Sequence, residues 1–199
     1  MFYHPKEGDH GLAFDPFKAI VAPRPIGWIS SLDPEGRTNL APYSFFNAVS
    51  SRPHIVMFSS AGWKDSVANI AATGEFVCNL TTWDLREAVN LSSATLPHDK
   101  SEFETTGLKT APSLLVKPPR VADAPAALEC KLLKYEELFT LDGQSADHFV
   151  AFGEVVGIHI DESFIRDGRF DMAMARTIAR CGYADYAVVE AVFEMVRPG

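Results

Sequence analysis

Three consecutive polar residues, Lys64, Asp65 and Ser66, stand where a helix is predicted to begin. Gly74 is expected to end this helix, whose apolar residues follow with helical spacing at Val67, Ile70 and Ala71. Asp65 or Ser66 is predicted to cap it. A helix N-terminus with free N–H groups, a hydroxyl and a lysine suits a phosphate, beside which Asp65 would need a partner such as Lys64 or Arg52. The alternative is a capped surface helix without a ligand.

A second candidate site is the run Pro42-Tyr43-Ser44-Phe45-Phe46-Asn47, which sets three aromatic side chains beside a serine and an asparagine. Pro42 interrupts regular backbone pairing, so N–H and C=O groups of this run are available to a ligand. Ring contacts, free backbone groups and a few polar side chains are what a flat aromatic ligand needs. The alternative is a hydrophobic corner that caps a barrel, because aromatic residues often fill cores.

Short β-prone segments flank the aromatic run and are expected to position it. Ile26 to Ser31 predicts a strand, and Asp33-Pro34-Glu35-Gly36 predicts the turn after it. Thr38 to Ala41 would then return as the second arm of a hairpin. Ile55 to Phe58 is a continuous apolar run, which predicts a strand buried on both faces.

The rest of the chain also favours strands, at Glu75 to Leu80, Leu128 to Leu132, His148 to Asp161 and Tyr186 to Met195. A polar turn is expected at 136–147, and Gly153 and Gly157 predict a bulge or bend. The pattern indicates a mainly β protein, a six- or seven-stranded antiparallel barrel with a few short helices. A doubly wound sheet would need regular β-α-β alternation and a G-x-G-x-x-G turn, and the sequence has neither.

Two segments lie outside this strand pattern within what we predict to be a single domain, 1–199. Residues 1–23 are expected to form an N-terminal arm with one helical turn after Asp15. Arg24 follows between prolines and could reach a phosphate; a solvated or ion-paired arginine is the alternative.

Residues 81–117 are predicted to be a helical excursion between strands. A capping-box variant at Thr81 to Asp84 would start one helix, and a capping box at Ser101 to Glu104 would start another that ends at Gly107. The excursion is expected to cover a barrel mouth or a neighbouring subunit.

Composition excludes several classes of function. A net charge of −8 over 199 residues argues against nucleic acid or an anionic membrane as the main partner. The start of the chain lacks the pattern of a signal peptide, and no apolar run has membrane-spanning length. Cys78, Cys130 and Cys181 form no C-x-x-C pair, and three free thiols fit a reducing compartment, so the cytoplasm is expected.

The sequence also lacks the common signatures of acid–base and metal catalysis. It has no nucleophile elbow, H-E-x-x-H or Walker loop. The histidines, including His98 and His159, do not fall at metal-ligand spacings, so no metal is expected. Such a chain is suited to chemistry that a cofactor carries out.

Several motifs in chain order resemble those of the flavin-reductase-like, FMN-binding split-barrel family of NAD(P)H:flavin oxidoreductases and flavoredoxin-type carriers. They are R-P-I-G-W-I-S-S, N-L-A-P-Y-S-F-F-N, K-D-S-V-A-N-I, G-E-F-V-C-N-L, V-K-P-P-R-V, A-L-E-C-K-L, F-G-E-V-V-G-I-H-I-D and I-A-R-C-G-Y. The resemblance covers nearly the whole chain. It implies a Greek-key split barrel that binds FMN, with NADH or NADPH as co-substrate, and a homodimer.

The resemblance also implies roles for matching residues, none of them catalytic. The first strand would line the flavin with Trp28, Ser30 and Ser31. The aromatic run would hold the isoalloxazine and ribityl chain, largely through backbone groups of Tyr43, Ser44, Phe45 and Asn47. The phosphate would be bound by Ser59, Lys64 and Ser66, with Asp65 orienting the helix start. Arg180 would reach the flavin from the C-terminal part, across a dimer interface.

The implied activity is flavin reduction, in which hydride passes from NAD(P)H to the flavin and no side chain moves a proton. The reduced flavin would serve a flavin-dependent oxygenase or another electron acceptor. The alternative is an FMN-bound electron carrier without fast NAD(P)H turnover. The sequence does not separate these two, nor NADH from NADPH.

Overall fold

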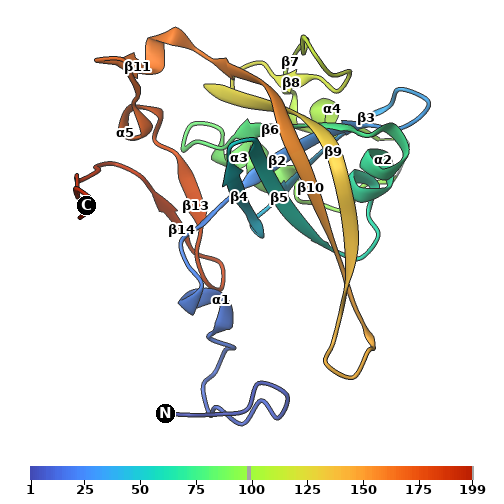
Figure 1. Cartoon of the computed structure of the whole chain (residues 1–199), viewed down its shortest axis with the longest axis vertical. Coiled ribbons are helices and arrows are strands. Elements are labelled where there is room, and N and C mark those ends of the chain that lie inside the picture. Colours follow the sequence, from blue (N-terminus) through green and yellow to red (C-terminus); the bar gives the residue numbers. More distant parts are fainter. Residues whose placement is uncertain (98–99, 199) are drawn as a thin grey trace.

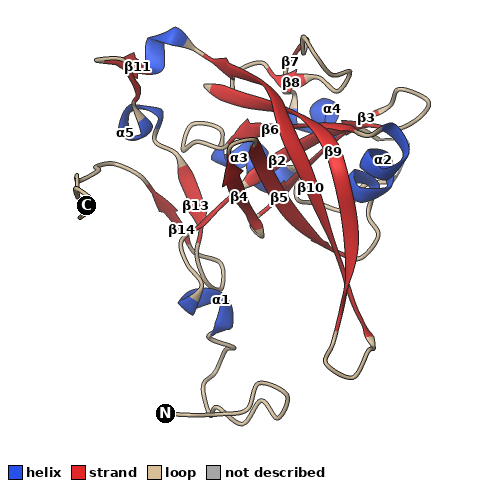
Figure 2. Cartoon of the chain, in the orientation of Figure 1, coloured by secondary structure: helices blue, strands red, loops and turns tan. Residues whose placement is uncertain are grey.

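The computed structural model describes residues 1–97 and 100–198 and shows a mainly β protein, as predicted (Figure 1, Figure 2). Its main sheet is antiparallel and has seven strands in the order β3-β2-β6-β9-β10-β5-β4. They are β2 (Gly27–Leu32), β3 (Thr38–Tyr43), β4 (Phe46–Ser51), β5 (His54–Ala61), β6 (Glu75–Leu80), β9 (Ala126–Phe139) and β10 (Ser145–Ile160).

The chain joins the two edge strands of this sheet directly, because only Ser44 and Phe45 separate β3 from β4. Next to this link, a Cβ added at Gly27 would lie 2.5 Å from Cδ2 of Phe46. Glycine is therefore required on β2 for the Phe46 ring to pack there. The non-sequential pairs β2–β6 and β10–β5 give the sheet its Greek-key order.

The first predicted hairpin is confirmed. Strands β2 and β3 pair from Leu32 opposite Thr38 to Gly27 opposite Tyr43. Gly36 has φ +85°, which is why this turn needs glycine.

The prediction that β5 is buried on both faces is wrong. Burial alternates along it, with Val56 and Phe58 buried and Met57 only partly buried. Helix α2 (Asp65–Thr73), which follows β5, packs mainly against β2 and β3 instead, so it leaves the outer face of β5 partly open.

Strands β9 and β10 form one long hairpin whose tip projects away from the rest of the sheet (Figure 1). The predicted irregularities are confirmed, since the pairing register shifts at Gly153 and at Gly157. A Cβ at Gly153 would lie 2.3 Å from Cζ of Phe76. The predicted polar turn is shorter than expected, because β9 continues to Phe139 and β10 already begins at Ser145.

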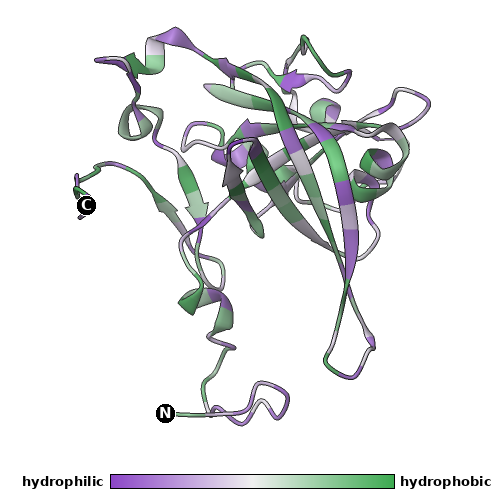
Figure 3. Cartoon of the chain, viewed as in Figure 1, coloured by the Kyte–Doolittle hydropathy of each residue, from purple (hydrophilic) through white to green (hydrophobic). Residues whose placement is uncertain are grey.

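The barrel core contains Ile29, Phe58, Ile70 and Phe76, and both buried cysteines belong to it, as Cys78 and Cys130. Figure 3 shows hydrophobic residues in green and hydrophilic residues in purple, and both kinds occur along the long strands β9 and β10. Burial, and after it the neighbouring Cys130, raises the pKa of the Cys78 thiol, so this thiol stays protonated and unreactive.

A second apolar cluster lies between the sheet and residues of the excursion. It joins Trp28 and Leu40 of the barrel to Val89 of α3 (Arg86–Leu91) and Phe103 of α4 (Glu102–Thr106). The excursion therefore packs against β2 and β3 through buried side chains.

The predicted helix starts need correction, whereas two predicted ends are confirmed. Lys64 is the N-cap of α2, so neither Asp65 nor Ser66 caps it. The helix predicted to start at Thr81 to Asp84 begins later, because α3 follows Leu85.

Ser101 is the N-cap of α4, but its Oγ lies 2.7 Å from Thr38 Oγ1 instead of capping the helix. Gly74 and Gly107 end α2 and α4 in the left-handed conformation, as expected (their φ values are +76° and +69°).

A buried carboxylate fixes the loop that leads back to the barrel. Glu129 on β9 is fully buried and accepts hydrogen bonds from the backbone N–H groups of Leu114, Leu115 and Val116. His159 Nε2 lies 2.5 Å from Glu129 Oε1, so this histidine is a satisfied structural residue, as expected. Burial alone raises the pKa of Glu129, but the hydrogen bonds from His159, Leu114 and Leu115 outweigh it and hold the pKa below its usual range.

A small separate sheet carries the C-terminal part. It consists of β1 (Arg24–Pro25), β13 (Ile178–Arg180) and β14 (Tyr186–Val188). The predicted strand Tyr186 to Met195 is wrong beyond Val188, and Phe193 and Met195 are 86% and 81% exposed. These residues have strand-like alternation, but no neighbouring strand of the described chain pairs with them.

The N-terminal arm contains the expected helical turn, α1 (Phe17–Ile20). Arg24 is buried, and its guanidinium donates to the carbonyls of Lys18 and Val21 and, over 2.8 Å, to that of Cys181. Arg24 thus links the arm to the C-terminal sheet. The alternative that it is a solvated or ion-paired arginine is wrong, because it is buried and bound to backbone carbonyls.

The remaining elements are short: β7 (Thr110–Ala111), β8 (Arg120–Val121), η1 (Glu162–Phe164), β11 (Ile165–Arg166), β12 (Arg169–Phe170) and α5 (Met172–Ala175). None of the helices in residues 1–97 and 100–198 has the length and apolarity needed to cross a membrane.

Candidate functional site

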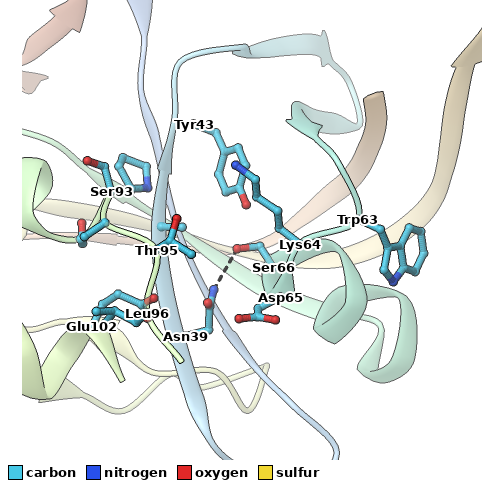
Figure 4. Close-up of a pocket in the computed structure, with 14 residues that line it drawn as sticks. Asn39, Tyr43, Trp63, Lys64, Asp65, Ser66, Ser93, Thr95, Leu96 and Glu102 are labelled. Carbon is cyan, nitrogen blue, oxygen red and sulfur yellow. Dashed lines mark hydrogen bonds between the residues drawn. The ribbon is translucent and has the colours of Figure 1, made fainter. Parts of the chain in front are cut away.

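The structure brings the two stretches that the sequence singles out into one pocket of about 300 Å³, which we call the α2 pocket (Figure 4). Lys64, Asp65 and Ser66 border it from the start of α2, and Pro42 and Tyr43 from the end of β3. The opposite wall is the loop 92–96 of the excursion. The polar helix start and the first two residues of the aromatic run, Pro42 and Tyr43, therefore face a single space.

The start of α2 is open to a ligand. Lys64 has an extended backbone (φ −91°, ψ 170°), and no side chain at this N-cap accepts a hydrogen bond from the first turn. The helix continues normally from Ala68, whose N–H donates to Lys64 O over 3.0 Å. First-turn N–H groups and the helix dipole both favour an anion at this position.

Ser66 is held by a buried polar network beneath this first turn. Asn39 Nδ2 donates to Ser66 Oγ over 2.8 Å, and Asn69 Nδ2 donates to Ser31 Oγ over 3.2 Å. Ser66 Oγ thus accepts from Asn39 and is also hydrogen-bonded to the Tyr43 hydroxyl. Burial raises the pKa of Tyr43, against the opposing effect of its hydrogen bond with Ser66, so the phenol stays neutral in this network.

Two carboxylates also belong to the α2 pocket, those of Asp65 and Glu102. Glu102 is buried, and its Oε2 accepts from Leu40 N over 2.8 Å. Burial is the main cause that raises the pKa of Glu102; the bond from Leu40 opposes it and the nearby Asp65 adds to it. An anion bound in the pocket would be repelled by Glu102 in its ionised form.

The charge of Glu102 gives a pH-dependent prediction. We expect Glu102→Gln to bind a phosphate ligand about threefold more tightly than the wild type at pH 8, because it removes one like charge. This difference should shrink as the pH falls through the raised pKa of Glu102, because the protonated carboxyl resembles the amide. The check is the ratio of the two dissociation constants, which cancels the titration of the ligand's own phosphate. A ratio that is constant with pH would contradict the prediction.

The loop 92–96 is the part of the pocket that sequence reasoning missed. It carries Ser93 and Thr95, whose exposed hydroxyls border the pocket opposite Lys64 (Figure 4). The run Ser92-Ser93-Ala94-Thr95 after an amphipathic helix was the available signal. Its importance depends on a contact between residues far apart in sequence.

That contact involves Trp28, which the family resemblance places against the flavin. Trp28 is fully buried, and its Nε1 donates to Ser92 Oγ over 2.9 Å. Ser92 Oγ in turn donates to Val89 O over 3.0 Å. Trp28 does not border the α2 pocket, but it holds the first residue of the pocket's far wall.

We therefore expect Trp28→Phe to weaken ligand binding in the α2 pocket by about three- to tenfold, because it removes one buried N–H···O bond and frees the loop 92–96. Fluorescence titration with FMN measures the affinity. Ser92→Ala should give a similar loss, and the double variant should lose little more than either single one. Fully additive losses would show that the two residues act separately.

The other predicted residues of the first strand are also internal. Ser30 Oγ donates to Pro119 O over 2.5 Å, and Ser31 belongs to the network under α2. Neither borders the pocket. Ser31 supports the start of α2 from beneath, whereas Ser30 fixes the backbone at Pro119.

The remaining residues of the aromatic run extend beyond the pocket. The N–H of Ser59 donates to Phe45 O over 2.8 Å, and the Arg24 guanidinium lies 5.8 Å from the centre of the Phe45 ring. Ser44 is half-buried, and the exposed Asn47 uses its Oδ1 to accept from the N–H of Ala48. Ser59 Oγ is buried and has no hydrogen-bond partner among the described residues.

Arg180 is not brought to the α2 pocket. It stands on β13 opposite Arg24, donates to Tyr183 O over 2.6 Å and lies over the Tyr186 ring at 4.4 Å. Within one chain it serves the C-terminal loop. Residues 1–97 and 100–198 contain no cluster of three acidic, histidine or cysteine side chains that could hold a metal; His98 lies outside the described residues.

Comparison with known proteins defines first the fold class and then the family. Over its full length the chain has the fold of a split-barrel protein from Shewanella frigidimarina NCIMB 400, at 22% identity over 100% of both chains and a TM-score of 0.84. The predicted split barrel is thereby confirmed. The model of the flavin reductase like domain matches residues 21–173, and the chain therefore belongs to the flavin reductase-like family.

Two solved structures are similar in sequence as well as in fold. Nitrilotriacetate monooxygenase component B from Bacillus cereus shares 30% identity over 98% of both chains, with a TM-score of 0.88. The 2-nitrobenzoate 2-nitroreductase NbaA from Pseudomonas fluorescens shares 27% identity over 100% of this chain and 96% of its own, with a TM-score of 0.86. The resemblance seen in the sequence motifs is confirmed at the level of the family.

Proposed function

We propose that this chain is a flavin reductase that binds FMN in the α2 pocket and uses NADH or NADPH as the hydride donor. The observation that carries the proposal is the pocket itself, in which the open N-terminus of α2, with Lys64 and Ser66, faces the same space as Pro42 and Tyr43. A phosphate and a flat ring system joined by a short chain need such a pair of neighbouring features.

The residues present fit an FMN phosphate. Lys64 supplies a positive charge, the first turn of α2 supplies N–H groups, and Ser66 adds a hydroxyl that Asn39 and Tyr43 hold in place. On the opposite wall, the hydroxyl of the exposed Thr95 adds a donor, whereas that of Ser93 already donates to Asn90 O over 2.6 Å. Together these groups replace the hydration of a phosphate with protein hydrogen bonds.

The aromatic run would hold the ring system. We assign the orientation of the ring system to backbone groups of Tyr43, Ser44, Phe45 and Asn47. Ser59, which the family resemblance assigns to the phosphate, does not border the α2 pocket; its buried Oγ, without a hydrogen-bond partner among the described residues, adds a polar atom beside this run. Bound FMN would supply the hydride-accepting chemistry. The chain's own task is to bind and orient, and no side chain of the site needs to give or take a proton in that step.

We further propose a homodimer in which Arg180 serves the site of a second copy. Large apolar side chains are exposed on the arm, the β9–β10 tip and the C-terminal tail, at Phe2, Phe14, Phe17, Phe139, Leu141, Phe193 and Val196. Such exposure favours an interface between copies.

The partner of the reduced flavin would be a flavin-dependent oxygenase. The similar protein from Bacillus cereus is named as a monooxygenase component, which supports this proposal.

We place the protein in the cytoplasm, where the thiols of Cys78, Cys130 and Cys181 would remain reduced. We infer that residues 1–199 form one FMN-binding domain.

A turnover assay with FMN and riboflavin tests this function. Oxidation of NADH or NADPH should be catalysed with FMN as acceptor, and the KM for riboflavin should be at least about tenfold higher, because riboflavin lacks the phosphate that α2 binds. Equal KM values would contradict the assignment of the phosphate to the α2 pocket. The absence of turnover with both nucleotides and both flavins would contradict the reductase itself.

A further inference from the structure

A second cavity of about 340 Å³ lies between α3 and the β13–β14 pair, and we call it the α3 cavity. None of its lining residues borders the α2 pocket. Ile178, Ala187 and Val188 give it an apolar side, whereas Trp83 and Tyr186 give it aromatic walls. Its size is that of a small-molecule site.

The aromatic walls are held in place without a ligand. The guanidinium carbons of Arg86 and Arg176 lie 4.2 Å and 5.2 Å from the centre of the Trp83 ring. The backbone of Trp83 is also fixed, since its N–H donates to Arg176 O over 2.9 Å and its carbonyl accepts from Arg86 Nη1 over 2.8 Å. Arg180 lies over Tyr186 at 4.4 Å. A wall that is already ordered loses little entropy when a ligand binds.

The charges around the α3 cavity compensate one another. Arg86 and Glu87, which line it, form an ion pair of 3.5 Å. Arg176 is faced by Asp84 at 3.9 Å and Glu190 at 3.6 Å. The rim therefore presents no net charge from its lining residues, and Asn90 adds an amide that both donates and accepts.

We propose that the α3 cavity is a second ligand site, which binds a small, uncharged, planar aromatic molecule that carries a carboxamide-like group. The rings of Trp83 and Tyr186 select a flat aromatic body, and the apolar side formed by Ile178, Ala187 and Val188 removes it from water. The Asn90 amide and the Arg86–Glu87 pair match a substituent that both donates and accepts hydrogen bonds. A carboxylate would disturb the compensated charges of the rim.

Calorimetric titration of the full chain with three probes tests the choice of ligand. Benzamide has the proposed ring and substituent, cyclohexanecarboxamide has the same substituent on a saturated ring, and benzoate has the same ring with a negative charge. We expect benzamide to bind about tenfold more tightly than either of the others. Equal affinities for the three probes, or binding of none of them, would overturn the proposal.

Two variants locate the binding. Ala187→Phe fills the α3 cavity from its apolar side, and Trp83→Leu removes an aromatic wall; each should weaken benzamide binding at least about tenfold. The matched control is Trp63→Leu, which removes an exposed tryptophan at the α2 pocket and should change benzamide binding less than twofold. Unchanged benzamide binding in Ala187→Phe would overturn the proposal even if Trp83→Leu fails to fold.

The same Ala187→Phe protein keeps this proposal separate from the proposed function. Its FMN affinity should equal that of the wild type, because Ala187 does not border the α2 pocket. A loss of FMN affinity in parallel with benzamide would show that the two cavities form one site, which would overturn the assignment of a second site.

Discussion

Replacing Lys64 and Ser66 together with alanine is expected to weaken FMN binding at least about a hundredfold, because two side chains assigned to the phosphate are lost at once. The fold should survive. Lys64 is exposed, and Asn39 Nδ2, which loses its bond to Ser66, keeps Ser31 Oγ at 3.4 Å. Fluorescence titration of apoprotein with FMN measures the affinity, and thermal unfolding monitors the fold.

The matched control is the double variant Lys134→Ala with Ser145→Ala, which removes the same two residue types from the exposed β9–β10 hairpin. It should bind FMN within about twofold of the wild type, since long-range effects of exposed charges are largely screened. Unchanged FMN affinity in the Lys64 and Ser66 variant would remove the phosphate assignment.

The largest effect on stability is expected from Glu129→Ala. The substitution leaves the N–H groups of Leu114, Leu115 and Val116 without their acceptor and removes the partner of His159. Loss of a buried, hydrogen-bonded carboxylate should lower the free energy of unfolding by about 3–5 kcal/mol. Urea unfolding measures this change, and Glu136→Ala, which replaces an exposed glutamate of the same strand, should change the free energy of unfolding by less than about 0.5 kcal/mol.

The pH dependence of stability gives a second readout for Glu129. Its pKa is lower in the folded protein than its ordinary value of 4.5, so the ionised group stabilises the fold above that pH. This contribution is lost as the pH falls through the folded pKa. Glu129→Gln should therefore lose stability less steeply than the wild type on the acid side. Parallel curves for the two proteins would contradict the role assigned to the carboxylate.

Local sequence signals predicted the elements whose structure is decided locally. The turn before β3 follows from Asp33, Pro34 and Gly36, and the ends of α2 and α4 follow from Gly74 and Gly107. Backbone conformation at these positions depends on the residue itself, so the pattern is sufficient.

Contacts between distant segments decided the features that were missed. The loop 92–96 becomes a wall of the α2 pocket because Trp28, 64 residues earlier, donates to Ser92. Ser101 uses its hydroxyl for Thr38 rather than for a capping bond, which no local pattern reveals. The alternation from Tyr186 to Met195 indicates a strand, but a strand also needs a partner, and the described chain offers none beyond Val188.

The central claim is hydride transfer to FMN held in the α2 pocket, and the visible spectrum of the FMN-loaded, desalted protein under anaerobic conditions tests it most directly. We predict that the flavin band is retained after desalting and is bleached within the mixing time when NADH or NADPH is added. The faster nucleotide identifies the preferred donor. A retained band that persists with both nucleotides and disappears only with dithionite would contradict the reductase and identify an electron carrier instead.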